Sequence, residues 1–333
     1  MCDLNIEKRN TNSLRAIASV GIMLTHLGNM ISAENSIWLF WGNIGYLCVG
    51  LFFFYSGYNL VYSYIDKGIS WKFLVDKLVK IGIPFWIGNG LYILIMKEKC
   101  SFSKALGIPV TNKVLWYLIS IGTIYFIFFI IFKPIDLLER KHTLRINRSV
   151  VITIASIAVF TIYVLLYPWI AYKFEIIFDN NSRFPLALII GMLVAIIKKA
   201  KSSSVKRFVR SNKVILFLIL MISCIFFHKE FLSEKQVIIW TYNVVEILPP
   251  LLFALAANVL VVEEQIKSAV LDFMGKISLW IYVLHIVCMH IWRNNVIFIK
   301  DDNLYVVVYV LTTILAGYIC SQIMDWIRNK LSS

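Results

Sequence analysis

The chain of 333 residues is 59% hydrophobic and only 16% charged, and its formal net charge is +14. A soluble domain is usually about one quarter charged, so this composition excludes an ordinary soluble protein and predicts a polytopic membrane protein. The apolar runs are continuous, whereas the strands of a spanning barrel alternate apolar and polar residues. The expected fold is therefore all-α. The six cysteines are scattered without a CxxC pair, so neither a disulfide framework nor a metal site is expected.

Ten apolar segments follow one another along the chain, and a helix that crosses a bilayer needs about 20 such residues. We expect about ten transmembrane helices, at residues 14–32, 42–65, 79–96, 114–132, 150–169, 184–197, 214–227, 238–262, 271–291 and 304–327. Lysine and arginine are enriched in the cytoplasmic loops of membrane proteins. Most of the 33 basic residues fall in segments that are cytoplasmic if the N-terminus is inside. This bias predicts an even number of spans with both termini in the cytosol.

The segments between these helices are too short for a folded domain. Residues 1–333 are therefore expected to form a single integral-membrane domain without an attached soluble domain. The basic charge is explained by topology, together with some attraction to anionic membrane lipids, and no nucleic-acid partner is expected. Any chemistry is expected within the helical bundle or at its faces.

The first predicted helix contains the stretch SLRAIASVGIMLTHL, with Arg15 at one end and His26 well inside. An ionisable residue within a span is a functional hypothesis, because burying it in hydrocarbon is unfavourable. The separation of Arg15 and His26 corresponds to about 1100° of rotation, about 20° from a whole number of turns, and to about 16 Å along the axis. Taken singly, the histidine could bond a neighbouring helix and the arginine could anchor the inner end. Because the two residues share a face, a functional role is favoured over these structural roles, with His26 as a general base.

Polar residues in the second and third predicted helices allow two interpretations each. Ser56 lies among glycines and aromatic residues that would also suit ordinary helix packing. Lys77 and Lys80 stand one turn apart at the cytoplasmic entrance of the third helix. They could bind a phosphate-bearing donor, but these residues taken alone favour positive-inside anchors.

The ninth predicted helix contains GKISLWIYVLHIVCMH, in which Ser278, Tyr282 and His285 share one face. A tyrosine and a histidine buried together could bind a hydroxyl or a carbonyl oxygen. Glu246 is the other acid within a predicted span, and it could orient a histidine or pair with a cation. The sequence does not identify its partner.

In this order, the segments resemble acyltransferase family 3, the bacterial integral-membrane O-acyltransferases. The stretches that carry the resemblance are LRAIASVGIMLTH, VGLFFFYSGYNL, KLVKIGIP, LWYL at 115–118, RFPLALIIGML at 183–193 and ISLWIYVLH at 277–285. The chain departs from the family pattern in two places. Asn12 and Ser13 stand where the family often has Asp-Gly, and Lys77 and Lys80 stand where it has arginines. Lysine keeps the charge but loses the bidentate fork of arginine.

The resemblance implies transfer of an acyl group, most often acetyl, from cytosolic acyl-CoA to a hydroxyl of a cell-surface glycan or lipid-linked sugar. Acetyl-CoA would be a co-substrate, with no bound cofactor, and the protein would lie in the bacterial cytoplasmic membrane. His26 would act as general base on the acceptor hydroxyl or would carry the acyl group itself. The donor phosphates would meet Arg15, Lys77 and Lys80. The residues expected to position the acceptor are Ser56, Tyr282, His285 and Glu246.

A secondary transporter of a small polar or anionic substrate is the main alternative, because it would also use ionisable groups within the membrane. Transporters are often built from two related halves with interrupted helices. Pro84 and the pair Pro249–Pro250 fall in the third and eighth helices, which is a faint sign of two five-helix halves. A glycan polymerase or ligase is a third possibility, but such proteins often carry a large outer loop that this sequence lacks.

Overall fold

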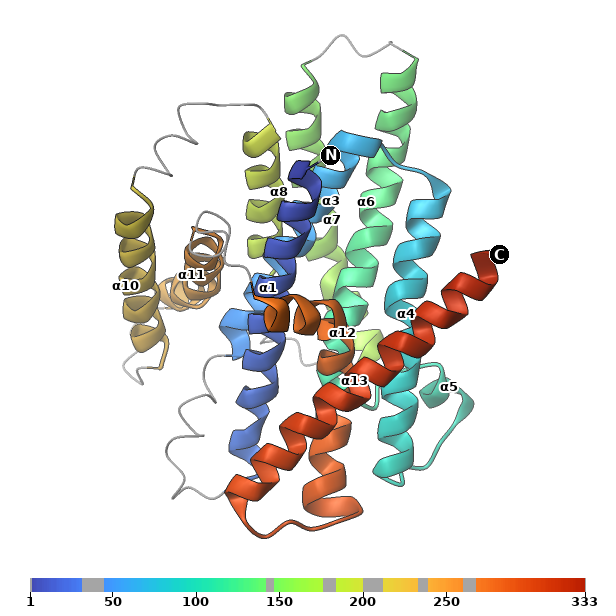
Figure 1. Ribbon diagram of the computed structural model, residues 1–333. Helices are drawn as coiled ribbons and strands as arrows, with labels where there is room; N and C mark the ends of the chain where they lie inside the picture. The colour runs from blue at the N-terminus through green and yellow to red at the C-terminus, as the bar shows by residue number, and fades with distance from the viewer. Residues whose placement is uncertain are drawn as a thin grey trace. The chain divides into compact units, whose positions relative to one another are not determined.

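The computed structural model describes residues 2–31, 45–141, 147–175, 184–199, 212–232, 239–259 and 268–332. Within these ranges the regular structure is entirely helical and includes no strand (Figure 1). The prediction of an all-α protein is confirmed.

The helices overlap all ten predicted segments and differ from them mainly at their ends. The α-helices are α1 (Cys2–Thr25), α3 (Gly45–Lys67), α4 (Trp71–Ile95), α5 (Phe102–Ala105), α6 (Trp116–Arg140), α7 (Arg148–Phe174), α8 (Pro185–Lys199), α10 (Lys213–Leu232), α11 (Ile239–Asn258), α12 (Ala269–His290) and α13 (Asp302–Ser332). In the described ranges they are accompanied by the short helical turns η1 (His26–Asn29), η3 (Lys113–Leu115) and η5 (Ile291–Asn295). The four-residue α5, in the connection between α4 and α6, was not predicted.

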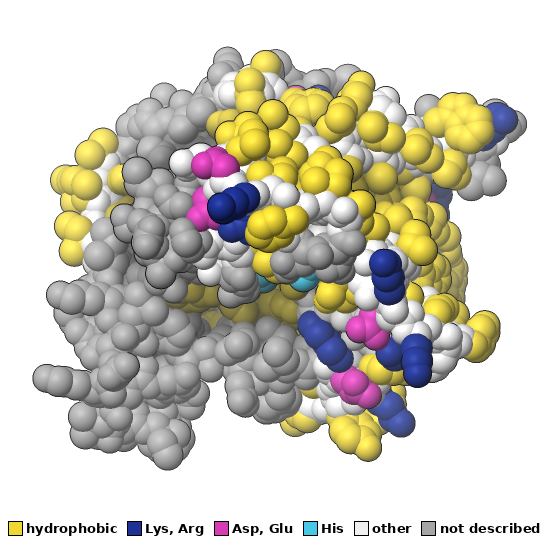
Figure 2. All heavy atoms as spheres, turned by 90° about the horizontal axis from the view of Figure 1, so that it is seen from below, with side chains coloured by type: hydrophobic (Ala, Val, Ile, Leu, Met, Phe, Trp, Pro, Cys, Tyr) yellow, Lys and Arg dark blue, Asp and Glu magenta, His cyan; other side chains and the backbone are white. Residues whose placement is uncertain are grey.

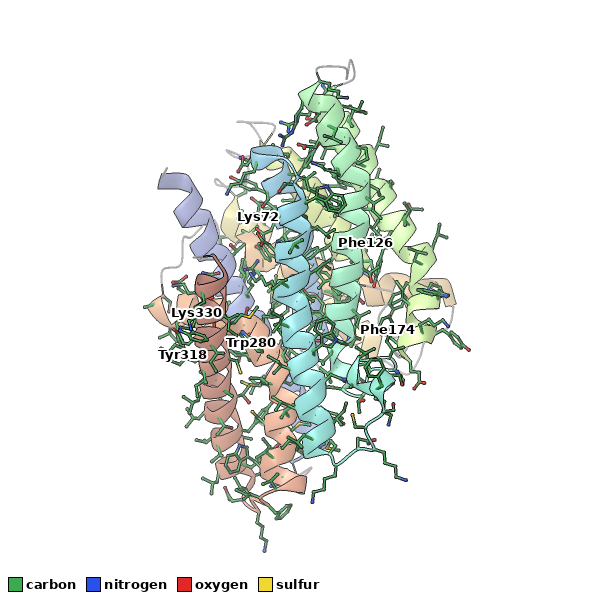
Figure 3. All side chains as sticks on the ribbon, turned by 90° about the vertical axis from the view of Figure 1, so that its right-hand side faces the viewer. Lys72, Phe126, Phe174, Trp280, Tyr318 and Lys330 are labelled. Atoms are coloured by element: carbon green, nitrogen blue, oxygen red, sulfur yellow. The ribbon has the colours of Figure 1, made fainter. Side chains whose placement is uncertain are left out.

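Five helices of the described part are long and apolar enough to cross a membrane. These candidate spans are Trp71–Ile95, Lys113–Arg140, Arg148–Phe174, Ala269–Arg293 and Asp302–Ile327. Exposed apolar side chains such as Phe126 of α6 project from the ribbon, as expected for contact with lipid (Figure 3). The apolar helices indicate a membrane protein. The count of ten spans and the cytoplasmic location of both termini stay predictions.

The chain divides into two compact units, and the first consists of Met1–Cys48, Ile83–Leu115 and Gln265–Ser333. In this unit α12 packs against both α1 and α13. The span that contains α12 is 61% buried, against 28% for the span that contains α13, so α12 is the central helix. Gly275 allows the close approach of α1 to α12, because a Cβ at this position would overlap the main chain of Asn12.

The second unit consists of Val49–Gly82 and Trp116–Glu264. Its helices α3 and α8 approach each other at two glycines. A Cβ on Gly57 would overlap the carbonyl of Leu188, and a Cβ on Gly191 would overlap the carbonyl of Phe54. Small residues allow this close packing of membrane helices. For Gly57, packing against another helix is therefore the role that the structure shows.

Candidate active site

His26 lies where α1 changes into the 3-10 turn η1. The α-helix continues through Thr25, whose φ of −58° and ψ of −38° are α-helical. The backbone between Arg15 and His26 is therefore regular, and the predicted spacing along one helix is preserved. Arg15 is half-buried. Its guanidinium forms no hydrogen bond or ion pair with the residues that the structure describes.

The ring of His26 faces the ring of His285 from α12. The two ring centroids are 5.1 Å apart and the planes are inclined by 40°. His285 is completely buried, whereas His26 is partly exposed. On the face seen from below, histidine surface is visible among hydrophobic side chains (Figure 2). The first unit therefore combines one accessible imidazole with one that is enclosed by protein.

The protonation pattern of His285 follows from its hydrogen bonding. Its Nδ1 lies 2.6 Å from the main-chain oxygen of Tyr282. Because a carbonyl oxygen can only accept, Nδ1 carries the hydrogen, and Nε2 of the neutral ring is then an acceptor. Nε2 is buried and has no hydrogen-bond partner among the described residues. A buried polar atom without a partner is rare in proteins, so Nε2 is available to a substrate group or to His26.

Tyr282 packs against His285 and is itself held by a hydrogen bond. Its hydroxyl donates a hydrogen bond to the main-chain oxygen of Val114, in the segment that precedes α6. Its ring centroid lies 5.8 Å from that of His285. The sequence predicted that Tyr282 and His285 would act from one face, and the structure shows them in contact. It also shows that the tyrosine proton is already bonded to the protein.

The other predicted site residues that can be described belong to the second unit. The Ser56 hydroxyl lies 3.2 Å from the Tyr117 hydroxyl. The Lys77 ammonium lies 5.5 Å from the ring centroid of Phe73 and 5.0 Å from that of Tyr125. Such cation–π contacts hold an ammonium group without neutralising it. No carboxylate pairs with Lys77 within the described ranges.

The structure gives little or no information on the contacts of the other two predicted residues, Lys80 and Glu246. Lys80 is exposed on α4. Glu246 belongs to α11, but its side chain lies outside the part of the chain that the structure describes. The prediction that it orients a histidine or pairs with a cation is therefore untested.

Two buried polar residues of the first unit were not predicted. Asn89 of α4 is completely buried; its amide nitrogen donates to Lys104, and its oxygen accepts from the main-chain nitrogens of Thr111 and Asn112. Tyr309 of α13 donates a hydrogen bond to a main-chain oxygen of α1. The sequence could have identified Asn89 as a candidate, because asparagine is unusual within an apolar helix. It could not have identified the hydrogen-bond partner of Tyr309.

The fold is that of a helical membrane protein in which the rings of His26 and His285 lie in contact. Residues 10–322 match a family described as an acyltransferase domain. The chain belongs to acyltransferase family 3, whose model covers nearly its whole length. Family membership indicates a membrane acyltransferase and favours this class over a transporter. No curated protein and no solved structure matches the chain.

Proposed function

We propose that the protein transfers an acetyl or other short acyl group from cytosolic acyl-CoA to a hydroxyl group of a cell-surface glycan or glycolipid. The contact between the rings of His26 and His285 carries the proposal. Transfer from a thioester to a hydroxyl requires one group that removes a proton from the acceptor and returns it to the leaving thiolate. An imidazole is well suited to both steps near neutral pH.

In the proposed reaction, a ring nitrogen of His26 removes the proton from the acceptor hydroxyl. The oxygen attacks the thioester carbonyl, the carbon–sulfur bond breaks, and the CoA thiolate takes the proton from His26. The products are the O-acyl ester and free CoA. In a second route His26 is the nucleophile. A ring nitrogen of His26 attacks the thioester, the carbon–sulfur bond breaks, and the CoA thiolate leaves with the ring proton. The acceptor hydroxyl then takes the acyl group from the histidine and returns its proton to the ring.

His285 assists His26 in this scheme. Because its Nδ1–H is bonded to the Tyr282 carbonyl, its Nε2 accepts a hydrogen bond from the acceptor hydroxyl or from the protonated His26. Both interactions become stronger as the proton moves, and such interactions accelerate the chemical step. His285 therefore positions and stabilises, and His26 transfers the proton.

The donor's phosphate groups are proposed to bind Arg15, Lys77 and Lys80. The best support comes from Lys77, whose ammonium is held between two aromatic rings. A cation without a carboxylate partner keeps its charge for a phosphate. Ser56, Tyr282 and Glu246 are proposed to position the acceptor, and the protein is proposed to lie in the bacterial cytoplasmic membrane with both termini inside.

The test uses membranes that contain the full-length protein, radiolabelled acetyl-CoA and a glycan acceptor. We expect transfer of label by the wild type and none by His26→Ala. His290→Ala is the matched control, because His290 is a partly exposed histidine of α12 whose ring packs on Tyr92, with centroids 5.9 Å apart. This control should retain the wild-type rate. Full activity in an inserted His26→Ala protein would refute the mechanism, and solute uptake without acyl transfer would identify a transporter.

A further inference from the structure

His26 directly follows the last turn of α1, and this turn is hydrogen-bonded to α13. In the last turn of an α-helix the main-chain carbonyls lack partners within the helix. In α1 this turn is followed directly by His26. The Tyr309 hydroxyl donates to the main-chain oxygen of Met23, over 2.9 Å. The bond joins α13 to the turn that precedes His26.

The same turn is held at a second point. The Thr25 hydroxyl donates to the main-chain oxygen of Gly21, over 2.9 Å. A Cβ on Gly45 would overlap the Thr25 side chain, so the start of α3 packs directly against this residue. Thr25 therefore holds the turn from within α1 and by packing, and the Tyr309 hydroxyl adds a contact from α13.

The side chain of Tyr309 is held in place by its surroundings, so it can fix the position of the Met23 carbonyl that it bonds. It is completely buried, and its ring stacks on that of Tyr305 with centroids 5.9 Å apart and planes inclined by 14°. Its own carbonyl accepts a hydrogen bond of 2.7 Å from Thr313. A side chain enclosed in this way has little rotational freedom, so its hydroxyl is a fixed donor for the Met23 carbonyl.

We infer that Tyr309 is a positioning residue for the acyl transfer: its hydroxyl sets the last turn of α1 and thereby orients the His26 ring toward His285 and the acceptor. The inference rests on the proposed function, because it assigns His26 the proton transfer. In this role Tyr309 acts through the main chain of α1. Catalysis is sensitive to small displacements of the reacting groups, so loss of the hydrogen bond should lower kcat and leave donor binding nearly unchanged.

The chain provides a closely matched control. Tyr305 lies one turn before Tyr309 on α13, is also completely buried, and has no hydrogen-bond partner for its hydroxyl among the described residues. Changing either tyrosine to phenylalanine removes one buried hydroxyl and keeps the stacked rings. Only Tyr309→Phe removes the bond to Met23.

The experiment measures kcat and the KM for acetyl-CoA in membranes that contain each full-length variant. For Tyr309→Phe we expect kcat to fall at least about fivefold, the loss of roughly one hydrogen bond, with KM within about twofold of the wild type. Tyr305→Phe should keep both constants within about twofold. Equal kcat values for the two variants would overturn the inference. Failure of Tyr309→Phe alone to insert would also overturn it, because the hydroxyl would then be needed for folding.

A second measurement does not depend on transfer. Diethyl pyrocarbonate modifies unprotonated imidazole, and the rate at His26 can be followed by mass spectrometry of its peptide. A less restrained His26 ring should react faster in Tyr309→Phe than in Tyr305→Phe or the wild type. An unchanged rate would show that Tyr309 does not orient His26. Full transfer activity in His26→Ala would refute the proposed function of His26. The rate of His26 modification by diethyl pyrocarbonate would still test whether Tyr309 orients the His26 ring.

Discussion

The roles of the two ring nitrogens of His285 can be tested separately by substitution. Asparagine at this position places an amide near Nδ1, which bonds the Tyr282 carbonyl. Glutamine reaches further and places an amide oxygen near Nε2, the buried nitrogen without a partner in the described structure. If Nε2 accepts a hydrogen bond during transfer, glutamine should replace it and asparagine should not.

The expected magnitude follows from the type of interaction. One hydrogen bond contributes about 0.5–1.5 kcal/mol, which corresponds to a factor of about 2 to 13 in rate. A general base contributes a factor of about 10² to 10⁴. Because His26 is assigned as the base, His285→Asn should lower kcat about tenfold, and His285→Gln should remain within about threefold of the wild type.

The assay is transfer of radiolabelled acetyl groups at saturating acetyl-CoA, with the amount of inserted protein measured for each variant. Equal rates for His285→Asn and His285→Gln would refute the assignment of Nε2 as an acceptor. A loss of about a thousandfold or more in both variants would show instead that His285 is the base.

Three further changes test the donor site and the fold. Arg15→Ala should raise the KM for acetyl-CoA severalfold because a cation at the proposed phosphate site is lost; an unchanged KM would remove Arg15 from the donor site. Lys77→Met should raise the same KM, whereas Lys72→Met, which changes an exposed lysine of the same helix (Figure 3), should not; equal effects of the two changes would contradict a specific role. Asn89→Ala leaves the main-chain nitrogens of Thr111 and Asn112 without their partner and should lower the free energy of unfolding in detergent by about 2–4 kcal/mol. Thr123→Ala, which removes only a bond to the main-chain oxygen of Ile119 within α6, should lower it by less than about 1 kcal/mol, and similar losses for the two variants would refute this reading of Asn89.

Much of the helical framework was predictable because burial in lipid imposes long continuous apolar runs. The relation between Arg15 and His26 was also predictable, since a regular α-helix repeats every 3.6 residues. The same argument put Tyr282 and His285 on one face, and the structure shows their rings in contact. These inferences succeed because each depends on neighbours along one helix.

Contacts between helices could not be derived in this way. The sequence named His26 and His285 as separate candidates, and packing of α1 against α12 brought their rings together. It suggested that Tyr282 could bind a hydroxyl or a carbonyl oxygen, and in the structure the Tyr282 hydroxyl donates to the carbonyl of Val114.

The sequence by itself determined an all-α membrane protein, the shared face of Arg15 and His26, and the resemblance to its family. Only the tertiary structure decided that His285 presents an unpartnered Nε2 and that Tyr309 holds the end of α1. The physical reason is the range of the interactions. Hydropathy and helical periodicity are local properties of the chain, whereas the partner of a buried polar group is set by how helices distant in sequence pack.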